Sequence, residues 1–511
     1  MTSKPLPIAL TVSGAVALGA YEGGVLAALI AGLRPLYRGD DPRVRIDVIG
    51  GASAGSIAGL LAARCITEGI DPIDVMREAW VVRDALSDLM KGAKGSPLTA
   101  ESLHDVAAEL LRMPGDAAQR QGKSVHLTMA LGALRGLEYD IKSKGFSTSP
   151  INASTYLDWK NVEVSPGQPL EDFVHAGAYR PGVDEPKMVD FALASGANAF
   201  GFPPMVVNRG ADEHDYDDNH ITNFPASKAY WYTDGGTLDN EPVGRTLDIA
   251  GGLDENEEVL RRLLVLIHPD PTAAPTGCAW ADPSNPPTWV ETLARAFTLQ
   301  TTQSIYDDLR HAAKTNRRVE ETDKVAKVLA TALAKLSSAE QAALVTQLAE
   351  ITATEMQGAI TEGVVRGALH HAAGLTGKHM IGIEVLSPLL LPEAQGPKAV
   401  PVKDLLAGEF LHHFGGFART ALRQHDFDLG YRTVLAWFGQ PHPPLAFHGL
   451  PGDADATAAA AALDCYKPPP DDGLGTTTFS SLSACEKLRF GQLFGKVAWS
   501  VVGGRMHPSH Q

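Results

Sequence analysis

The spacing of apolar residues changes repeatedly along the first half of the chain, from short β-branched runs to longer stretches with helical periodicity. The short runs predict strands at residues 8–14, 44–50, 125–134, 231–236 and 262–269. Apolar residues three and four apart predict helices between them, at residues 25–33, 57–69 and 97–113. This alternation favours an α/β unit with a largely parallel central sheet.

The pattern beyond the first sheet is mainly helical. A Pro-rich break covers residues 268–289, and residues 290–375 are Ala-rich with apolar side chains along one helical face. Ser337 and Glu340 have the spacing of a capping box, which predicts that a second helix begins there. We expect the apolar face to pack on the sheet, with a lid over a functional site or a lipid-facing surface as the alternatives.

The remainder of the chain begins with a strand pattern at residues 380–388, which we expect to return to the first sheet. Residues 446–475 are rich in Pro, Ala and Gly and predict a mobile loop. The chain therefore divides into an α/β core at 1–270, a Pro-rich linker with a helical insertion at 271–378, and a C-terminal region at 379–511. That last region holds the returning strand, further helices and the loop.

The N-terminal segment has two interpretations. Its early lysine, apolar run and small residues are compatible with a secretory signal, and equally with a first core strand followed by a Gly-rich loop. We favour the strand, because the four glycines of residues 14–24 suit a loop better than the apolar helix of a signal. No other stretch has the pattern of a transmembrane helix, so we expect a cytoplasmic or peripheral membrane location.

Charge and cysteine content exclude several classes of protein. The formal net charge is −16, whereas nucleic-acid binding needs a basic face, so we expect no nucleic-acid partner. Contact with a lipid surface through apolar side chains remains compatible with this charge. The four cysteines are scattered, which favours neither a disulfide framework nor a zinc site and suggests a reducing compartment.

Ser53 lies in the stretch GGASAGS, directly after a predicted strand and before a predicted helix. A Gly-x-Ser-x-Gly turn in this context exposes the hydroxyl beside the free amides of the helix N-terminus. Gly51 and Gly55 allow the backbone to approach the serine closely on both sides. The pattern is typical of a nucleophile, although small-residue turns of this kind also bind phosphates.

A Gly-rich loop and an aspartate could complete such a site. Residues 13–29 lack both the Lys-Ser/Thr pair of a P-loop and the glycine order of a Rossmann turn, which leaves a loop with amides for an oxyanion. Asp234 ends a predicted strand and is followed by Gly235 and Gly236. It is a candidate base, with an Asx-type turn cap as the alternative.

Three motifs, which follow one another along the chain as they do in the family, make the chain resemble the patatin-like phospholipases. The nucleophile motif is matched by residues 51–55 and the Asp-Gly-Gly motif by residues 234–236, followed by Asn240 and Pro242. The family's Gly-rich oxyanion loop aligns without gaps on residues 14–19, followed by Gly-Val-Leu at 24–26. Softer matches lie at residues 194–204 and, more weakly, at 414–438.

The resemblance implies a three-layer α/β/α fold and a lipid acyl hydrolase with a Ser–Asp dyad. Ser53 would be the nucleophile and Asp234 its base, without a catalytic histidine, metal or cofactor. The oxyanion would be held by the backbone amides of Gly14, Ala15 and Val16. The substrate would be a lipid or simple ester, with contact at a membrane surface, and the sequence leaves the oligomeric state open.

Three residues depart from the family pattern. Leu18 replaces the arginine of the oxyanion loop, which puts a preference for phosphate-bearing headgroups in doubt and favours a neutral lipid or simple ester. Ala15 and Val16 replace two of its glycines. Because a β-branched residue is strained at positive φ, we expect Val16 to adopt an ordinary backbone conformation.

Other functions stay open at this point. A weakly catalytic lipid-binding scaffold would keep the same fold, and an acyltransferase would use the same acyl-enzyme. A Ser–His–Asp triad would need a histidine after the aspartate, His268 or one beyond it. The acidic residues of 212–220 could bind a cation, but they lack the spacing of an EF-hand, and we expect a solvated loop there.

Overall fold

One mixed sheet organises the protein in the computed structural model. The structure describes residues 4–83, 98–99, 101–141, 151–199, 201–218, 220–257, 261–271, 284, 286–352, 360–376, 378–411, 413–440, 452–470 and 473–503. The sheet has eight strands, in the order β5-β6-β3-β2-β1-β7-β8, and β4 pairs with β3. The strands are β1 (Leu6–Val12), β2 (Val44–Gly51), β3 (Val125–Ile141), β4 (Ile151–Val164), β5 (Met205–Asn208), β6 (Ala229–Asp234), β7 (Arg261–Ile267) and β8 (Met380–Leu386).

The centre of the sheet is parallel, as the sequence predicts. Strand β1 pairs in parallel with β2 and β7, and the run continues in parallel to β3 on one side and β8 on the other. Strands β4 and β6 are antiparallel to β3, and β5 is antiparallel to β6. The strand expected at residues 380–388 thus returns to the sheet beside β7, after the helical residues that separate the two in sequence.

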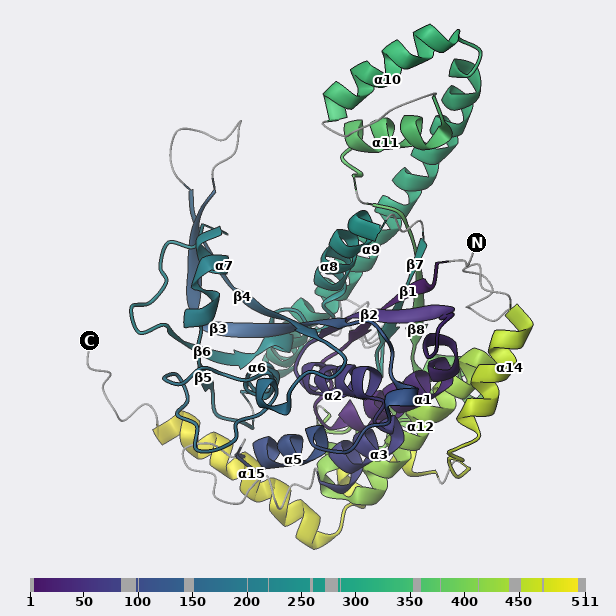
Figure 1. Ribbon diagram of the computed structural model, residues 1–511. Helices are drawn as coiled ribbons and strands as arrows, with labels where there is room; N and C mark the ends of the chain where they lie inside the picture. Colours follow the sequence, from purple (N-terminus) through teal and green to yellow (C-terminus); the bar gives the residue numbers. More distant parts are fainter. Residues whose placement is uncertain are drawn as a thin grey trace.

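Helices cover both faces of the sheet, which confirms the three-layer fold (Figure 1). Ile8, Leu10 and Val12 of β1 join a large apolar cluster with the helices of one face, whereas Ala9 joins a smaller cluster with the other. The first layer includes α1 (Gly19–Tyr37), α2 (Ala54–Glu68), α3 (Pro72–Arg77), α5 (Glu101–Leu111), α6 (Met188–Ser195) and α12 (Thr420–Phe438). The second includes α8 (Val243–Glu257) and the beginning of α9 (Trp289–Leu333).

The N-terminal segment forms β1, which confirms the strand interpretation, but the expected Gly-rich loop is shorter than predicted. Helix α1 already begins at Gly19, after one short 3₁₀ turn. The later glycines permit close packing inside the layer: a Cβ on Gly24 would lie 2.0 Å from the Phe427 carbonyl oxygen of α12. In the described chain, one stretch, Val16–Tyr37, is long and apolar enough for a membrane span, and 94% of its apolar window is buried in the protein.

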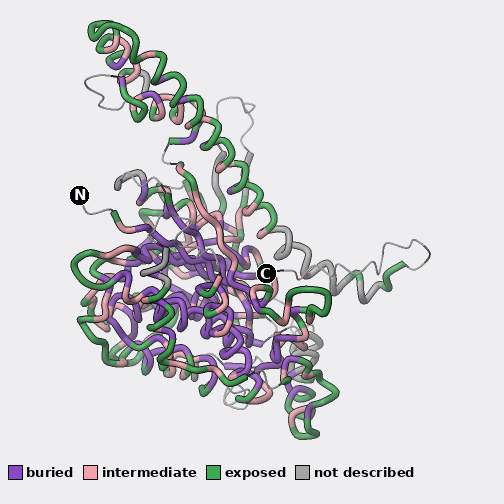
Figure 2. Tube along the Cα trace, turned by 90° about the vertical axis from the view of Figure 1, so that its right-hand side faces the viewer, coloured by how far each residue is buried: buried purple, intermediate pink, exposed green. Residues whose placement is uncertain are grey.

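Helices α9, α10 (Ser338–Thr352) and α11 (Glu362–Ala372) form an arm that projects from the core (Figure 1). Near the core, Asn316 of α9 forms two hydrogen bonds with the backbone of Ile381 in β8. Farther out, the arm has only a small cluster of its own and is largely exposed (Figure 2). The expectation that the apolar face packs on the sheet is therefore wrong, because Val325, Val328 and Leu329 of that face are exposed.

The predicted capping box of the arm is present. The Ser337 amide donates a hydrogen bond of 2.9 Å to Glu340 Oε2, and the Glu340 amide donates one of 3.4 Å to Ser337 Oγ. The expected break at 268–289 and loop at 446–475 lie partly outside the described residues, as does Cys278. Within the described part, the mobile-loop prediction is wrong for α14 (Gly452–Leu463), because this Ala-rich run forms a helix that packs on α1 through buried Ala459 and Leu463. The last helix is α15 (Ala484–Gly503).

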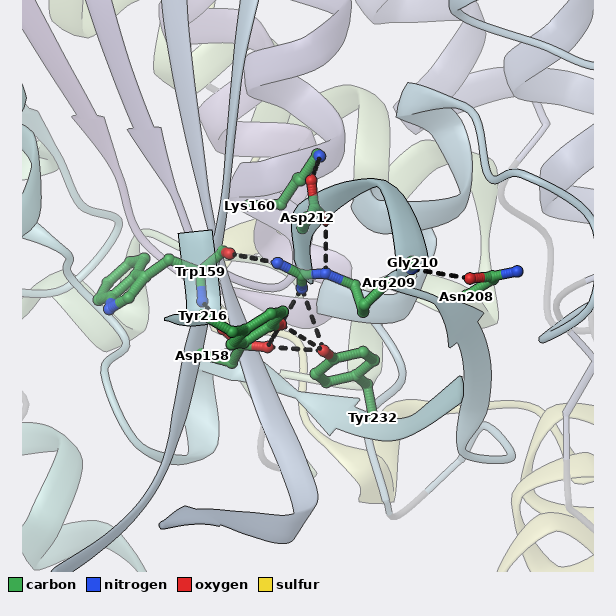
Figure 3. Close-up of polar contacts among 9 residues, drawn as sticks. All are labelled: Asp158, Trp159, Lys160, Asn208, Arg209, Gly210, Asp212, Tyr216 and Tyr232. Atoms are coloured by element: carbon green, nitrogen blue, oxygen red, sulfur yellow. Dashed lines mark hydrogen bonds and ion pairs between the residues drawn. The ribbon is translucent and has the colours of Figure 1, made fainter. Parts of the chain in front are cut away.

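The acidic segment at 212–220 is also more ordered than expected, since it includes helix α7 (Glu213–Asp218). Asp212 is 8% exposed and accepts hydrogen bonds from Lys160 and Arg209. Arg209 also donates to Asp158 and to the hydroxyl of Tyr232, and the Tyr216 hydroxyl of α7 donates to Asp158, so this buried network joins α7 to strands β4 and β6 (Figure 3). Within this network, Asp158 is paired with Arg209, and Asp212 is paired with both Arg209 and Lys160. The bond from Arg209 to Tyr232 also holds β6, the strand that ends at Asp234.

Candidate active site

Ser53 occupies a sharp turn between β2 and α2. Its φ of 52° and ψ of −124° lie outside the usual regions for a residue with a side chain, and such strain is typical of functional sites. Gly51 ends the strand, and Gly55 lies in the first turn of the helix. A Cβ on Gly55 would lie 2.3 Å from the Val12 carbonyl oxygen, so glycine is required for the helix to start this close to β1.

Asp234 is the last residue of β6 and lies against the serine. The Ser53 hydroxyl donates a hydrogen bond of 2.8 Å to Asp234 Oδ2, although the two residues are 181 positions apart in sequence. Asn198 Nδ2 donates to the same oxygen at 3.1 Å, and the Gly236 amide donates to Oδ1 at 2.8 Å. Gly235 and Gly236 form the turn after the strand, so the Asx-type turn and the contact with the serine are made by one side chain.

Burial makes the Asp234 carboxylate a stronger base than a solvent-exposed aspartate. Asp234 is 3% exposed, and desolvation raises its pKa from 3.8 to about 6, against the lowering effect of the hydrogen bonds from Ser53, Gly236 and Asn198. At neutral pH it is therefore ionised, and it accepts a proton more readily than a solvent-exposed aspartate would. An aspartate of this kind can deprotonate a hydroxyl that already donates to it.

The Gly14 amide, expected as an oxyanion donor, already has an acceptor within the protein. The Gly14 amide donates 3.0 Å to the carbonyl oxygen of Asn240, so this N–H is already used within the protein. Asn240 Nδ2 donates in turn to the Gly14 carbonyl oxygen at 3.0 Å. A Cβ on Gly14 would lie 2.4 Å from Asn240 Oδ1 and 3.0 Å from Ser53 Cβ. Gly14 thus allows the loop, Asn240 and the serine to meet, and its own amide is not open to an oxyanion in this structure.

The amides of Ala15, Val16 and Ala54 have no hydrogen-bond acceptor among the residues that the structure describes. Ala54 follows the serine and begins α2, where the amide of a nucleophile turn contributes to an oxyanion hole. This residue was missed in the sequence, although its place directly after Ser53 is the signal that would have identified it. Val16 and Ala54 both line the cavity next to Ser53.

The expectation of an ordinary backbone at Val16 is wrong, because its φ is 51°. Its neighbours hold it there: the Ala17 amide donates to His413 and the Leu18 amide donates back to Ala15. A β-branched residue at positive φ is strained, and here the side chain is turned toward the cavity. Leu18, at the family's arginine position, is fully buried in the core, so it supplies no charge to the site.

A layer of buried polar groups lies beneath the loop. Ser13 Oγ donates 2.7 Å to Glu22 Oε1, and burial raises the pKa of Glu22 well above its usual range. Asn240 Nδ2 donates 2.6 Å to Glu241 Oε1, which also lies 2.9 Å from His268 Nε2. The triad candidate His268 therefore contacts Glu241. In the described part of the chain, no histidine hydrogen-bonds to Ser53 or Asp234.

Two further polar residues near the serine come from the segment of the softer motif at 194–204. The Ser53 amide donates 3.0 Å to Ser195 Oγ, which also lies 2.7 Å from Ser56 Oγ. Asn198 holds the aspartate, as described above. Neither role was inferred from the sequence, because a small-residue stretch gives no sign of which polar side chain faces the site.

A narrow apolar cavity of about 80 Å³ opens beside Ser53. Its walls come mainly from α2, α5 and α6, with Trp80, Phe202 and Phe417 from other segments. No described residue of the arm lines this cavity, so the lid alternative has no support in this conformation. A serine hydroxyl bonded to a buried carboxylate, nearby amides without an acceptor in the described chain, and an apolar cavity together suit attack on a carbonyl that carries a hydrocarbon chain.

Comparison with known proteins bears on residues 10–247, which match the family model described as Patatin-like phospholipase. The uncharacterized protein y4iI of Sinorhizobium fredii (strain NBRC 101917 / NGR234) is 26% identical over 377 residues, 57% of this chain and 53% of that protein. The chain thus spans about half the length of this relative. A solved structure, VipD from Legionella pneumophila, aligns with 98% of this chain and 92% of its own at 12% identity, with a TM-score of only 0.20.

Proposed function

Because residues 10–247 of this chain belong to the patatin-like phospholipase family, whose members act on lipids, we propose that the protein is a serine lipid acyl hydrolase. The observation that carries the proposal is the hydrogen bond of 2.8 Å from Ser53 Oγ, which lines an apolar cavity, to the buried Asp234 carboxylate. The proposed reaction is hydrolysis of an acyl ester of a glycerolipid.

In the first half of the reaction, Ser53 Oγ attacks the ester carbonyl while Asp234 Oδ2 takes the hydroxyl proton. The negative charge that develops on the carbonyl oxygen is stabilised by the free amides of Ala15, Val16 and Ala54. When the carbon–oxygen bond to the glycerol breaks, the protonated Asp234 returns its proton to the leaving oxygen. An acyl group then remains bound to Ser53.

In the second half, a water molecule takes the place of the departed alcohol. Asp234 accepts a proton from this water, and the hydroxide attacks the acyl carbonyl. Breakage of the bond to Ser53 Oγ releases the fatty acid, and the proton on Asp234 returns to the serine. The enzyme is restored without a metal or cofactor in any step.

The substrate follows from the walls of the site. The apolar cavity suits the acyl chain, which would bury its methylenes there at about 0.8 kcal/mol each. Leu18 supplies no charge for a phosphate, which favours a neutral glycerolipid or simple ester. We assign the chemistry to residues 1–270, with Phe417 of the C-terminal region completing the cavity. Entry of a lipid would require peripheral contact with a membrane surface.

Analysis of lipid products tests this proposal. Purified protein is incubated with mixed glycerolipids, and the released fatty acids are measured for the wild type and for Ser53→Ala. We expect release by the wild type and none above background by the variant. Folded wild-type protein that releases no fatty acid from any glycerolipid or simple ester would instead support a lipid-binding scaffold.

A further inference from the structure

A cluster of metal-ligand types lies behind one wall of the cavity. His104 comes from α5, Asp190 from α6, and His175 from the segment before α6. His175 Nε2 lies 2.6 Å from Asp190 Oδ2, and His104 Nε2 lies 3.5 Å from Asp190 Oδ1. The three ligand atoms lie within 4.8 Å of one another. We propose that His104, His175 and Asp190 bind a divalent transition metal, and that Zn²⁺ fits this set best.

Two of the ligand atoms make no hydrogen bond within the described part of the chain and form only a long ion pair with each other. Asp190 is 1% exposed, yet its Oδ1 accepts no hydrogen bond, and His104 Nε2 is likewise buried without one. Buried polar atoms of this kind are costly unless a partner satisfies them. These two atoms face each other across 3.5 Å, too far for a good hydrogen bond, and a cation between them would satisfy both.

The spacing suits a small tetrahedral ion. Zinc bonds of 2.0–2.2 Å to nitrogen and oxygen place neighbouring ligand atoms about 3.3 Å apart, so small side-chain shifts would bring all three into place. Two imidazoles and a carboxylate are a common zinc set, and a water would complete the tetrahedron on the side of His104, whose side chain is 28% exposed. The same donors also suit ferrous iron, which the experiment below includes.

Neighbouring groups hold the ligands in position, as second-shell groups do in metal sites. The Lys187 amide donates 2.7 Å to Asp190 Oδ2, which fixes the carboxylate and leaves Oδ1 free. The ring of Tyr179 stacks on His175 with 3.9 Å between ring centroids. The His104 and His175 rings are tilted by 17° to one another. The site is thus partly organised before any ion binds.

A bound ion would connect the cavity wall to the nucleophile turn, a consequence that rests on the proposed function. Leu103, next to His104, lines the cavity from α5, and Leu193 lines it from α6. Ser195, which accepts the Ser53 amide, lies five residues after Asp190, about 7.5 Å along the helix. The ion would fasten α5 to α6 and so stiffen the wall against which an acyl chain binds.

Metal binding to the full chain tests the site without any turnover. Protein stripped with a chelator is dialysed against Zn²⁺, Fe²⁺ or Co²⁺, and the bound metal is measured by elemental analysis. We expect one high-affinity Zn²⁺ per chain, tetrahedral absorption bands with Co²⁺, and a higher Tm with Zn²⁺ than without it. Ser53→Ala should bind Zn²⁺ as the wild type does, so failure of the metal site and failure of the hydrolase proposal are distinguishable.

Three histidine variants identify the ligands. His104→Gln and His175→Gln should each lower Zn²⁺ affinity by more than the roughly 10- to 100-fold that loss of a second-shell partner costs. The control is His214→Gln, because His214 forms an exposed pair with Asp218 and its side chain is 83% exposed. Circular dichroism without metal confirms that each variant is folded. A wild type without a high-affinity site, or binding that is equal in all three variants, would overturn the proposal.

Discussion

The proposed chemistry depends on the buried carboxylate of Asp234. Raising its pKa from 3.8 to about 6 makes the ionised form about 3 kcal/mol less favourable than it is in water. The hydrogen bonds from Ser53, Asn198 and Gly236 keep that cost from being larger. The protein thus keeps a desolvated carboxylate next to a serine whose own backbone is strained.

The first prediction concerns the pH dependence of turnover. Because Asp234 must be ionised to accept the serine proton, kcat/KM should rise with pH through about 6 and then level off. Asp234→Asn should lower kcat by roughly 10²- to 10⁴-fold, the usual contribution of a general base. Rates with a soluble ester across this range check both, and an Asp234→Asn enzyme of nearly full activity would refute the assigned base.

The second prediction concerns stability. A pKa that is raised on folding contributes stability that is fully present below pH 3.8 and lost as the pH rises through about 6. The wild type should therefore lose stability relative to Asp234→Asn across this window. Urea unfolding of both proteins at pH values below and above the window measures the difference, and parallel curves would contradict the burial argument.

At the scale of residues, the sequence identifies side chains that lie in a motif typical of a particular chemistry. Ser53 and Asp234 could be selected in this way, and their assigned roles stay predictions. Ala54, Ser195 and Asn198 could not, because their contributions depend on which atoms the fold turns toward the serine. Val16 was wrongly placed because intrinsic preference was overridden by hydrogen bonds of its neighbours, which no local pattern shows.

The close crossing of α1 and α12 is the main feature at the scale of elements. A Cβ on Gly24 would meet the Phe427 carbonyl oxygen at 2.0 Å, and one on Gly430 would meet the Tyr21 carbonyl oxygen at 2.1 Å. Backbone atoms cannot move aside as side chains do. These glycines let two helices far apart in sequence pack against each other, and the Gly-rich loop beside Ser53 lies directly before α1.

The third prediction follows from this crossing. Gly24→Ala should destabilise the protein by at least the roughly 1–3 kcal/mol of an overpacked core, despite alanine's better helix propensity. Gly252→Ala in α8 is the matched control: nothing lies within 4 Å of its added Cβ, so we expect no loss and a gain of up to about 1 kcal/mol. Urea unfolding measures both, and an equally stable Gly24→Ala would contradict the crossing.

Residue type explains which elements could be predicted from the sequence and which could not. The parallel strands were identified because buried β-branched runs leave few alternatives. The start of α1 was placed too late, because glycines that serve helix packing look the same in sequence as glycines that serve a loop. Helix α14 was interpreted as a loop because its flanking prolines and glycines outweighed its alanine run.

At the scale of the whole molecule, the sheet of the core could be predicted from the sequence better than the arm could. The return of β8 to the sheet could be predicted, since a strand pattern after the helical block has few other places to pair. The projection of the arm could not, because periodicity reveals an apolar face without showing what covers it. Val328 lies on that face, is 70% exposed and does not line the cavity.

The fourth prediction is that the arm does not contribute to turnover of a soluble ester. Val328→Asp should leave kcat/KM for a soluble ester within about twofold and stability within about 0.5 kcal/mol, because exposed substitutions away from special features have small effects. Leu193→Asp, in the cavity wall, is the contrasting variant and should abolish turnover. A large loss of soluble-ester activity in Val328→Asp would restore the lid interpretation.

Covalent labelling with a fluorophosphonate, followed by intact-mass and peptide mass spectrometry, tests most directly whether Ser53 and Asp234 act together. We predict one adduct per chain, located on Ser53, formed much more slowly in Asp234→Asn and absent from folded Ser53→Ala. An adduct on another residue, or a labelling rate unchanged by Asp234→Asn, would contradict the assignment of these two residues as nucleophile and base.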